Sequence, residues 1–409
     1  MKTKIRFLFG LAALILAALA CVFPPGGNSP AEPVNVETIV AETFSALTGV
    51  APEISATPPP ATVSLLPHSM YFLNNDSANL AQVYRLERDG KSITQLTFEP
   101  AKVEGYDVSL VDGSVAYVSN NQLLTVNADG SNRSMVVDGG VRDENNPFLT
   151  SITNPVWSPN GQTIAYGYKG LNFYSIISGQ SNRVLDNDID DLGGGLFVPR
   201  EMYWPEKYSA DGSRLVITLG YYEGASAAIY YPNGNALVRL SNDAGAFICC
   251  GYTEWTADGS ALYSAYPYMG MFMPGLWRVD SANGTVTTLV NGDPGNGTFN
   301  YADAPYPGSD GQLYYFFANQ PNTSEFASRP PLQIVRSGMD GVTNRTILRP
   351  ETFELMNESL WAPDASFVIV AMAPVQDVYQ GGRAELYYTD GQQGAISLIP
   401  FAMNMKWGP

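Results

Sequence analysis

Short apolar runs alternate with polar turns along residues 67–409. Runs such as 164–166 and 313–316 are rich in β-branched and aromatic residues and are bounded by turn-forming residues, which is typical of β-strands. Many of the turns are Asn-Gly or Asp-Gly, whose residues accept the positive φ angles of a tight hairpin turn. The pattern therefore predicts an all-β body built from antiparallel hairpins.

The hairpins repeat as a larger unit. A first turn recurs every 47 to 54 residues, at Gly113, Gly161, Gly212, Gly259, Gly311 and Ala365. A second turn follows later in each unit and occurs seven times, at Gly90, Gly130, Gly179, Gly234, Gly284, Gly341 and Gly391. Two such turns imply four strands in each unit, which is the blade of a β-propeller. The sequence predicts seven four-stranded blades over residues 67–409.

The repeat carries a recognisable signature. A unit carries one motif near its start and a second motif near its end. The first is clearest at Trp157-Ser158-Pro159-Asn160-Gly161, and the second is clearest at Asp129 to Arg133 of the preceding unit. This pair of motifs resembles the TolB-like propeller repeat, which is also found in the propeller domains of dipeptidyl peptidase IV relatives. The resemblance covers residues 67–409 and implies the fold far more specifically than the function. TolB-like proteins are components of envelope complexes, so the resemblance implies a protein partner.

The two ends of the repeat region are incomplete in a complementary way. The first unit lacks an innermost strand, because residues 69–73 already have the pattern of the strand that follows the first turn. The C-terminal residues 405–409 look like a unit that is cut off just before its turn. We expect the C-terminal strand to complete the first blade and so remove an open sheet edge.

The N-terminal residues have the layout of an export signal. Lys2, Lys4 and Arg6 precede an apolar run over residues 7–20, and small residues lead to Cys21. This is the layout of a lipoprotein signal peptide over residues 1–20, with Cys21 as the lipidated first residue of the mature chain. An ordinary signal peptide with an incidental Cys is the alternative.

Residues 21–66 are Pro- and Thr-rich and are expected to form a tether, with a short helix over 35–48. We therefore expect a protein that is exported, lipid-anchored to the cell membrane or envelope, and extracytoplasmic.

Strand parity assigns the connections to two faces. Successive strands of a blade are antiparallel, so the Gly turns all reach one face, and the remaining connections and inter-blade links reach the other. Every long insertion falls in the second class: 186–204, 220–227, 266–275, 317–331 and 373–383. Loops on a rigid scaffold are where binding residues concentrate. The aromatic and Met residues of these loops are the candidate ligand-binding residues, with packing of the loops against one another as the alternative: Tyr221, Tyr222, Tyr266, Tyr268, Met271, Phe272, Phe326 and Tyr379.

Two further groups are candidates for chemistry. Asp186, Asp188, Asp190 and Asp191 place oxygen atoms at nearly alternate positions before a Gly, as at the front of a calcium loop, although the EF-hand pattern is incomplete. A solvated acidic loop is the alternative reading. Cys249 and Cys250 are adjacent, and form either a strained vicinal disulfide or two buried thiols.

Composition limits the function classes. The formal charge of −17, from 22 basic and 39 acidic residues, argues against a nucleic-acid partner. His68 is the only histidine, which removes the usual general base and a common metal ligand from the core. No nucleophile motif is present, and no cofactor is required, although Ca²⁺ is the cation that the acidic segment would take. We therefore expect a binding or scaffold module for an envelope protein, peptide or glycan, rather than an enzyme. The alternative function is a calcium-dependent propeller hydrolase, lyase or lactonase.

Overall fold

The computed structural model describes residues 64–409 except 242–247, 249–250, 269–272 and 323–328. These residues form antiparallel strands and a short 3-10 turn, Pro147–Leu149. The strands are β1 Met70–Asn75, β2 Ala81–Leu86, β3 Ile93–Gln95, β4 Val103–Val108, β5 Val115–Ser119, β6 Gln122–Val126, β7 Ser134–Asp138, β8 Thr153–Trp157, β9 Thr163–Gly167, β10 Gly170–Ser175, β11 Gln180–Asp186, β12 Asp188–Asp191, β13 Phe197–Tyr208, β14 Leu215–Tyr221, β15 Gly224–Tyr231, β16 Ala236–Arg239, β17 Tyr252–Trp255, β18 Ala261–Tyr266, β19 Gly275–Asp280, β20 Val286–Asn291, β21 Thr298–Pro307, β22 Gln312–Pro321, β23 Gln333–Gly338, β24 Thr346–Ile347, β25 Met356–Trp361, β26 Phe367–Met372, β27 Gly382–Tyr388 and β28 Ile396–Trp407.

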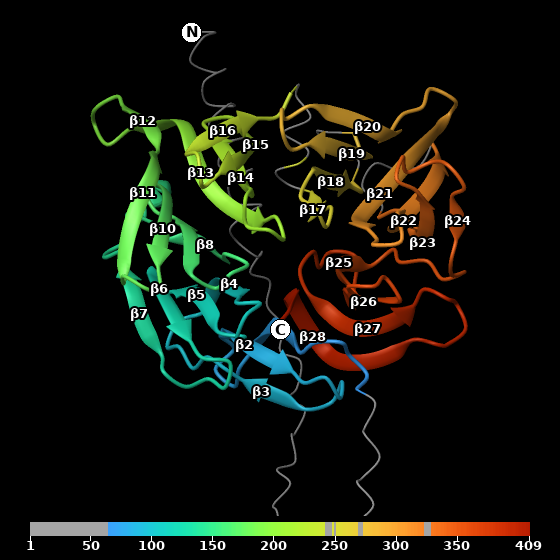
Figure 1. The fold of residues 1–409 in the computed structure, drawn as a ribbon, viewed down its shortest axis with the longest axis horizontal. Helices are drawn as coiled ribbons and strands as arrows, with labels where there is room; N and C mark the ends of the chain where they lie inside the picture. The colour runs from blue at the N-terminus through green and yellow to red at the C-terminus, as the bar shows by residue number, and fades with distance from the viewer. Residues whose placement is uncertain (1–63, 242–247, 249–250, 269–272, 323–328) are drawn as a thin grey trace, which may run out of the picture. The chain divides into compact units, whose positions relative to one another are not determined.

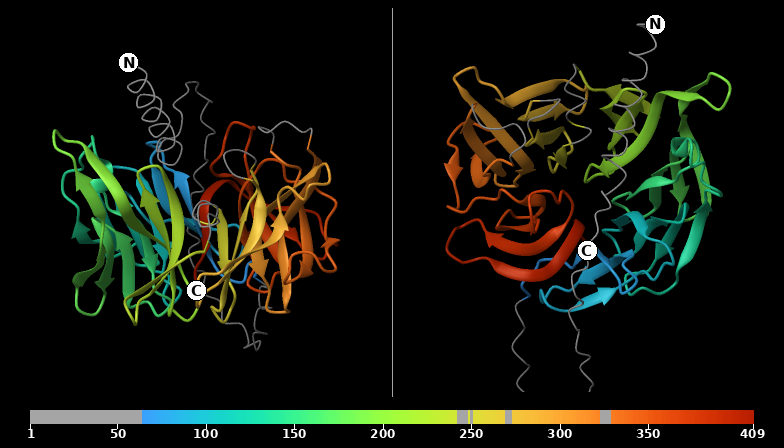
Figure 2. Two further views of the ribbon diagram at one scale, coloured as in Figure 1. Left: turned by 90° about the horizontal axis from the view of Figure 1, so that it is seen from above. Right: turned by 180° about the vertical axis from the view of Figure 1, so that it is seen from behind.

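The strands assemble into seven blades around a central axis (Figures 1 and 2). Blades 2, 3, 5 and 6 are separate four-stranded sheets: β4–β7, β8–β11, β17–β20 and β21–β24. Blade 4 is β13–β16 with β12 added to the start of β13, and blades 7 and 1 are joined in one seven-stranded sheet. The predicted all-β propeller of seven blades is confirmed.

Strand β28 closes the ring as predicted. Its first half pairs with β27, where Ala402 lies opposite Gly382, and completes blade 7. Its second half pairs with β1, where Trp407 lies opposite Met70, and supplies the missing inner strand of blade 1. One 12-residue strand therefore belongs to two blades, and β1 has no open inner edge.

The hydrophobic core lies between blades. Each pair of neighbouring blades encloses one cluster of buried side chains, seven clusters in the described residues. Between blades 7 and 1, for example, Met70 and Met405 pack with Ile369 and Leu386. Because both faces of a blade are covered in this way, the second strands read as nearly continuous apolar runs, such as Leu313 to Phe316 of β22.

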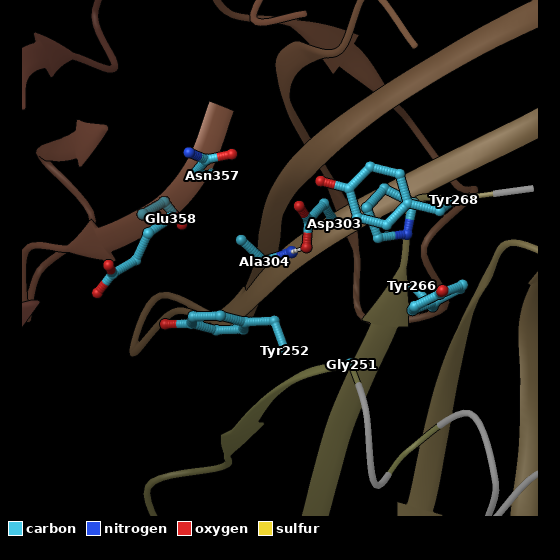
Figure 3. Close-up of a pocket in the computed structure, with 10 residues that line it drawn as sticks. Gly251, Tyr252, Tyr266, Tyr268, Asp303, Ala304, Asn357 and Glu358 are labelled. Atoms are coloured by element: carbon cyan, nitrogen blue, oxygen red, sulfur yellow. Dashed lines mark hydrogen bonds between the residues drawn. The ribbon is translucent and has the colours of Figure 1, made fainter. Parts of the chain in front are cut away.

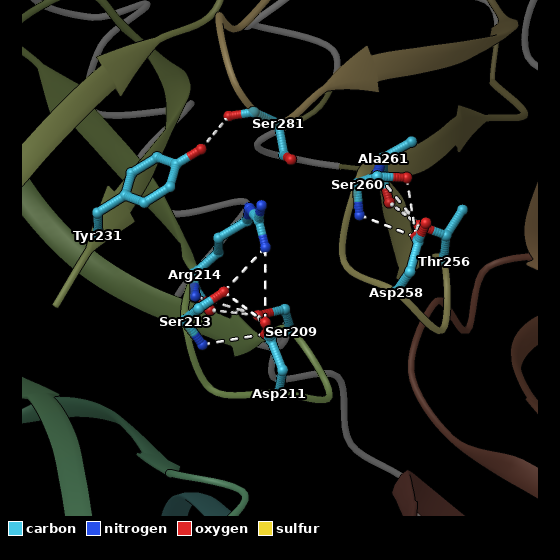
Figure 4. A network of polar contacts seen from close by, with 10 residues as sticks. All are labelled: Ser209, Asp211, Ser213, Arg214, Tyr231, Thr256, Asp258, Ser260, Ala261 and Ser281. Carbon is cyan, nitrogen blue, oxygen red and sulfur yellow. Dashed lines mark hydrogen bonds and ion pairs between the residues drawn. The ribbon is translucent and has the colours of Figure 1, made fainter. Parts of the chain in front are cut away.

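The Gly turns are stabilised by the side chain that precedes the glycine. In the first turn of blade 4, Asp211 Oδ1 accepts hydrogen bonds from the Ser209 hydroxyl at 2.6 Å and the Ser213 amide at 3.1 Å (Figure 4). Asp258 repeats this arrangement in blade 5 with the Ser260 amide at 3.0 Å. Arg214 from blade 4 also stacks on the Tyr231 ring at 5.6 Å. Asp-x-Ser turns of this kind fix the hairpin register.

The turns and the longer loops reach opposite faces as predicted, but one predicted insertion is wrong. The Gly turns are the first and third connections of the blades, and the longer loops 267–274, 322–332 and 373–381 are second connections. We call the face that carries these second connections and the links between blades the loop face. The segment 220–227 is not a long insertion: β14 and β15 extend into one hairpin whose turn is only Tyr222 and Glu223. Paired backbone hydrogen bonds continue to its tip, so this segment offers no irregular loop.

The packing of β28 should make a measurable contribution to the free energy of unfolding. Met405 of β28 is 5% exposed in the cluster between blades 7 and 1. We expect Met405→Ala to lower the free energy of unfolding by about 2–5 kcal/mol, because it leaves a cavity at the ring closure. Chemical denaturation measures the change. The control Met135→Ala, at a 48% exposed position of β7, should change it by less than about 0.5 kcal/mol. Equal effects of the two substitutions would contradict the role of β28.

Candidate functional site

A pocket of about 210 Å³ lies where the inner strands of blades 5, 6 and 7 begin (Figure 3). Its walls come from the starts of β17 and β25, from the middle of β21, and from the loop after β18. The lining residues are Gly251, Tyr252, Tyr266, Pro267, Tyr268, Asp303, Ala304, Asn357, Glu358 and Ser359. Inner strands enter a blade from the loop face, so the pocket lies toward that face of the ring.

Polar contacts join neighbouring inner strands nearly all the way round the ring. Lys406 binds Asp107 at 2.7 Å, Asn154 donates to Glu206 at 3.1 Å, and Lys207 binds Glu254 at 2.6 Å. The contacts that complete the series are Trp157 N to Asp107 at 2.6 Å, Trp361 Nε1 to the Ala304 carbonyl at 2.9 Å, and Asn404 N to Glu358 at 2.7 Å. In the described residues, no hydrogen bond joins β17 to β21. The pocket lies at this interface.

Asp303 is the acidic group on the β21 side of the pocket. A bulge in β21, with Ala304 at φ 47°, disrupts the pairing with β22 between Asp303 and Tyr306. The Ala304 amide donates to Asp303 Oδ1 at 2.7 Å. No ion pair to Asp303 is formed by any described residue. Burial raises the pKa of Asp303 to about 7, against the lowering effect of the Ala304 amide.

Glu358 has a different role from Asp303. Figure 3 shows its carboxylate turned away from Asp303. It accepts hydrogen bonds from the backbone amides of Asn404, at 2.7 Å, and Met405 in β28. Burial raises the pKa of Glu358 to about 7, although both amides and Lys406 favour the charged form. Glu358 therefore ties blade 7 to the closing strand, while Asp303 faces the pocket.

Aromatic side chains form much of the pocket wall. The rings of Tyr266 and Tyr268 meet edge to face, with centroids 5.7 Å apart. Burial raises the pKa of Tyr268 to about 12, and nearby Asp303 acts in the same direction. Burial also raises the pKa of Tyr252 well above its ordinary value, with Glu358 and Asp303 contributing. Tyr252 and Tyr268 are therefore neutral hydrogen-bond donors at physiological pH.

Arg329 holds the loops of blades 6 and 7 over this region. It is 6% exposed, and its Nη1 donates to Asn357 Oδ1 at 2.8 Å. Its Nη2 donates to the Val378 carbonyl, and its guanidinium lies over the Tyr379 ring at 4.5 Å. Asn357 in turn donates to the Gly381 carbonyl at 2.6 Å. The second connections of blades 6 and 7 are thus fixed to β25 beside the pocket.

The structure brings some of the predicted binding residues together. Tyr266 and Tyr268 line the pocket, and Tyr379 lies beside it on Arg329, 60% exposed. Tyr221 and Tyr222 lie on the β14–β15 hairpin of blade 4 and do not line the pocket. The remaining candidates lie outside the described residues: Met271, Phe272, Phe326, Cys21, Cys249 and Cys250.

The acidic segment forms a hairpin rather than a loop. Asp188 and Asp190 lie in β12, which pairs with β13. Asp190 binds Arg200 at 2.7 Å, and Asp186 binds Arg183 at 2.9 Å. The Gly193 amide donates to Asp191 at 2.8 Å. Within the described residues, no three acidic, His or Cys side chains are grouped so that they could hold a metal ion. Calcium binding by this segment stays a prediction.

Sequence reasoning missed the pocket residues on the inner strands. These residues are Asp303, Glu358 and Tyr252, which lie within strands, whereas the sequence predicted binding residues in the loops. A usable signal was present: Glu206, Glu254 and Glu358 each lie within three residues before the aromatic residue of the repeat. A charged residue at that position in an otherwise apolar strand indicates a side chain that faces the axis.

Comparison with known proteins supports the fold. No protein-family model and no curated protein matches the sequence. An oligogalacturonate lyase in complex with manganese matches the structure with a TM-score of 0.53, at 8% identity over 82% of this chain and 86% of the lyase. A prolyl endopeptidase matches with a TM-score of 0.52, at 12% identity over 83% of this chain and 49% of the peptidase. TolB from Acinetobacter baumannii matches with a TM-score of 0.41, at 14% identity over 83% of this chain and 82% of TolB.

The similarities to the lyase and the peptidase show the propeller fold, as the sequence predicted. The chain spans about half the length of the prolyl endopeptidase that it resembles. A search of the described residues for a helix long and apolar enough to cross a membrane finds none.

The half-buried, desolvated carboxyl of Asp303 predicts a pH-dependent stability. An acid whose pKa is raised on folding contributes stability that is fully present below its unfolded pKa, near 3.8, and is lost as the pH rises through about 7. From pH 5 to 7 the free energy of unfolding should therefore fall, by at most about 1.4 kcal/mol per pH unit from this group. Asp303→Asn, which is neutral throughout, should flatten that slope in denaturation curves measured from pH 5 to 8.

The matched control is Glu144→Gln, which removes one negative charge at an exposed position and should leave the slope unchanged. Glu358 contributes to the slope in the same sense, so the slope of Asp303→Asn should be reduced and not zero. A slope identical to that of the wild type would show that Asp303 does not titrate in this range.

Proposed function

We propose that this chain is an exported, membrane-tethered binding module that holds a protein, peptide or glycan at the pocket between blades 5, 6 and 7. The observation that supports it best is the convergence of three blades on one aromatic pocket. Tyr252, Tyr266 and Tyr268 come from blade 5, Asp303 from blade 6, and Asn357 and Glu358 from blade 7. Tyrosine is one of the residue types that dominate binding energy at interfaces.

The surroundings of the pocket suit binding by a preformed surface. Arg329 is held by Asn357 and by the Val378 carbonyl, so these residues lose little freedom when a ligand arrives. Pro267 lies between Tyr266 and Tyr268 and restricts the backbone there. A ligand would therefore meet side chains that are already positioned.

The proposed location rests on the N-terminal sequence. Lys2, Lys4 and Arg6, the apolar run and Cys21 together favour export and lipidation of Cys21. Cys21→Ser should release the protein from membranes into the soluble fraction, because the thiol that carries the lipid is then lost. Fractionation of cells that express the two proteins measures this. A wild-type protein that is itself fully soluble would contradict the tether.

Variants of the pocket test the binding site. Tyr268→Ala and Tyr379→Ala should each weaken capture of a partner from envelope extracts by at least about 30-fold, the effect of losing an anchor worth about 2 kcal/mol. The control is Ile177→Ala, which removes an 80% exposed apolar side chain from a turn on the opposite face. Capture on immobilised protein, followed by titration of the identified partner, measures the effect. If Ile177→Ala lost binding and the two pocket variants kept it, the binding site would lie on the face that carries the Gly turns.

A second candidate function is an enzyme that acts at the same pocket. The observation that favours it is Asp303, whose pKa of about 7 suits a general acid or base at neutral pH. The capture experiment separates the two functions, because an enzyme returns a chemically changed ligand and a binding module returns the same one. Calcium dependence of this reaction would require ligands beyond those that the described residues group together.

A further inference from the structure

Among the described residues, Asp303 differs from the other carboxylates of the inner strands in accepting a single hydrogen bond, from the amide of the next residue. Asp107 and Glu254 are each bound by a lysine, and Glu206 accepts from Asn154. Glu358 accepts two backbone amides of β28. Among the described residues, the adjacent Ala304 amide is the one donor to Asp303, on Oδ1. In a partly buried carboxylate without a cationic partner the charged form is destabilised, and a ligand that brings a cation relieves this cost.

The walls around Asp303 suit the apolar part of such a ligand as well as its charge. Tyr252, Tyr266 and Tyr268 line the same pocket, and the faces of tyrosine rings attract cations. Ser359 also lines the pocket; it is 3% exposed, and its hydroxyl has no hydrogen-bond partner among the described residues. A donor on the ligand could therefore meet two acceptors, the Asp303 carboxylate and the Ser359 hydroxyl.

The charges near the pocket disfavour an anion. Arg329 is the cation nearest to Tyr268, and its Nη1 and Nη2 are occupied by Asn357, Met356 and Val378. Its Nε is buried without a partner and is closed to solvent. The whole chain carries a formal charge of −17, which attracts cations to its surface. A divalent metal ion is also disfavoured, since the described residues offer no group of three acidic, His or Cys side chains.

We propose that the pocket recognises an aliphatic ammonium group of its ligand, with the nitrogen on Asp303 and the alkyl chain between Tyr252, Tyr266 and Tyr268. This inference rests on the proposed binding function and names the chemistry of the ligand. Two sources share that chemistry: a lysine side chain and the free amino terminus of a peptide. The tyrosine-lined walls favour the lysine side chain, whose four methylene groups would lie along the rings.

Binding of an ammonium group should release a proton. The group binds the ionised form of Asp303, which is the minor form below pH 7. The affinity should therefore rise about tenfold from pH 6 to 8, while lysine, with an ordinary pKa near 10.4, stays charged. The other titratable groups around the pocket are Tyr252, Tyr266, Tyr268, Glu358 and Arg329. Burial raises the pKa of Glu358 to about 7 as well, so Glu358→Gln has to be measured beside Asp303→Asn.

The experiment is an NMR or calorimetric titration of the full chain with small probes. Nα-acetyl-lysine methylamide represents the side chain, triglycine represents the amino terminus, and the N-acetyl methylamide of 2-aminoheptanoic acid, whose side chain is n-pentyl, is the uncharged isostere. We expect saturable binding of the lysine probe, at least tenfold weaker binding of triglycine, and none of the isostere. Tenfold or greater loss in Asp303→Asn, with no change in the exposed control Glu144→Gln, is the expected signature. Tyr268→Phe should keep most of the affinity and Tyr268→Leu should lose it, because the ring face makes the contact.

Other outcomes overturn the proposal in different ways. Equal binding of the lysine probe and its isostere would show an apolar pocket without ammonium recognition. Tighter binding of triglycine would move the assignment from a lysine side chain to an amino terminus. Unchanged affinity in Asp303→Asn would remove Asp303 from the site. Each of these results leaves the partner-capture experiment with Tyr268→Ala and Tyr379→Ala unaffected, so a failure of the ammonium assignment is distinguishable from a failure of the binding function.

Discussion

The pairing of β28 with both β27 and β1 is the interaction on which the rest of the structure depends. Every hydrophobic cluster of the described residues lies between two blades, so no blade buries its apolar surface alone. The cluster between blades 7 and 1 contains Leu66 and Met70 from one end of the repeat region and Met405 from the other. If the ring did not close, this cluster would be exposed on both sides, and the inner edge of β1 would be unpaired.

The same closed ring explains where a binding site can arise. Six of the seven interfaces between inner strands carry a hydrogen bond or ion pair, and the β17–β21 interface carries none in the described residues. The pocket lies at that interface. Because polar contacts hold the other six interfaces, the ring tolerates one interface without a hydrogen bond between its described inner strands. Polar groups that lack partners in native proteins are often functional.

The sequence predicted the parts of the fold that depend on local backbone chemistry. Glycines indicate turns because they accept positive φ angles, as Gly161 and Gly259 do. The spacing of these glycines therefore predicted the number of blades and the face that each connection reaches. The sequence pattern predicted a long insertion at residues 220–227, whereas the structure has an extended hairpin there. Asp303 was missed for a deeper reason. Bulges with positive φ at Asn154, Ala304 and Asn404 shift the side-chain alternation of the inner strands, and a shift of one residue exchanges the faces of a strand. Which residues face the axis therefore depends on distortions that no residue pattern reports.

The shared strand also has a consequence for the order of events during biogenesis. The contacts of Asn404 with Tyr106 and of Lys406 with Asp107 join residues 298 and 299 positions apart. Chains dominated by such distant pairings fold slowly, since the entropy of closing the loop is lost before the contacts form. A chain delivered from its N-terminus exposes the edge of β1 until residue 407 has emerged. For that interval the nascent propeller is vulnerable to edge-to-edge aggregation, and its last dozen residues decide when the vulnerability ends.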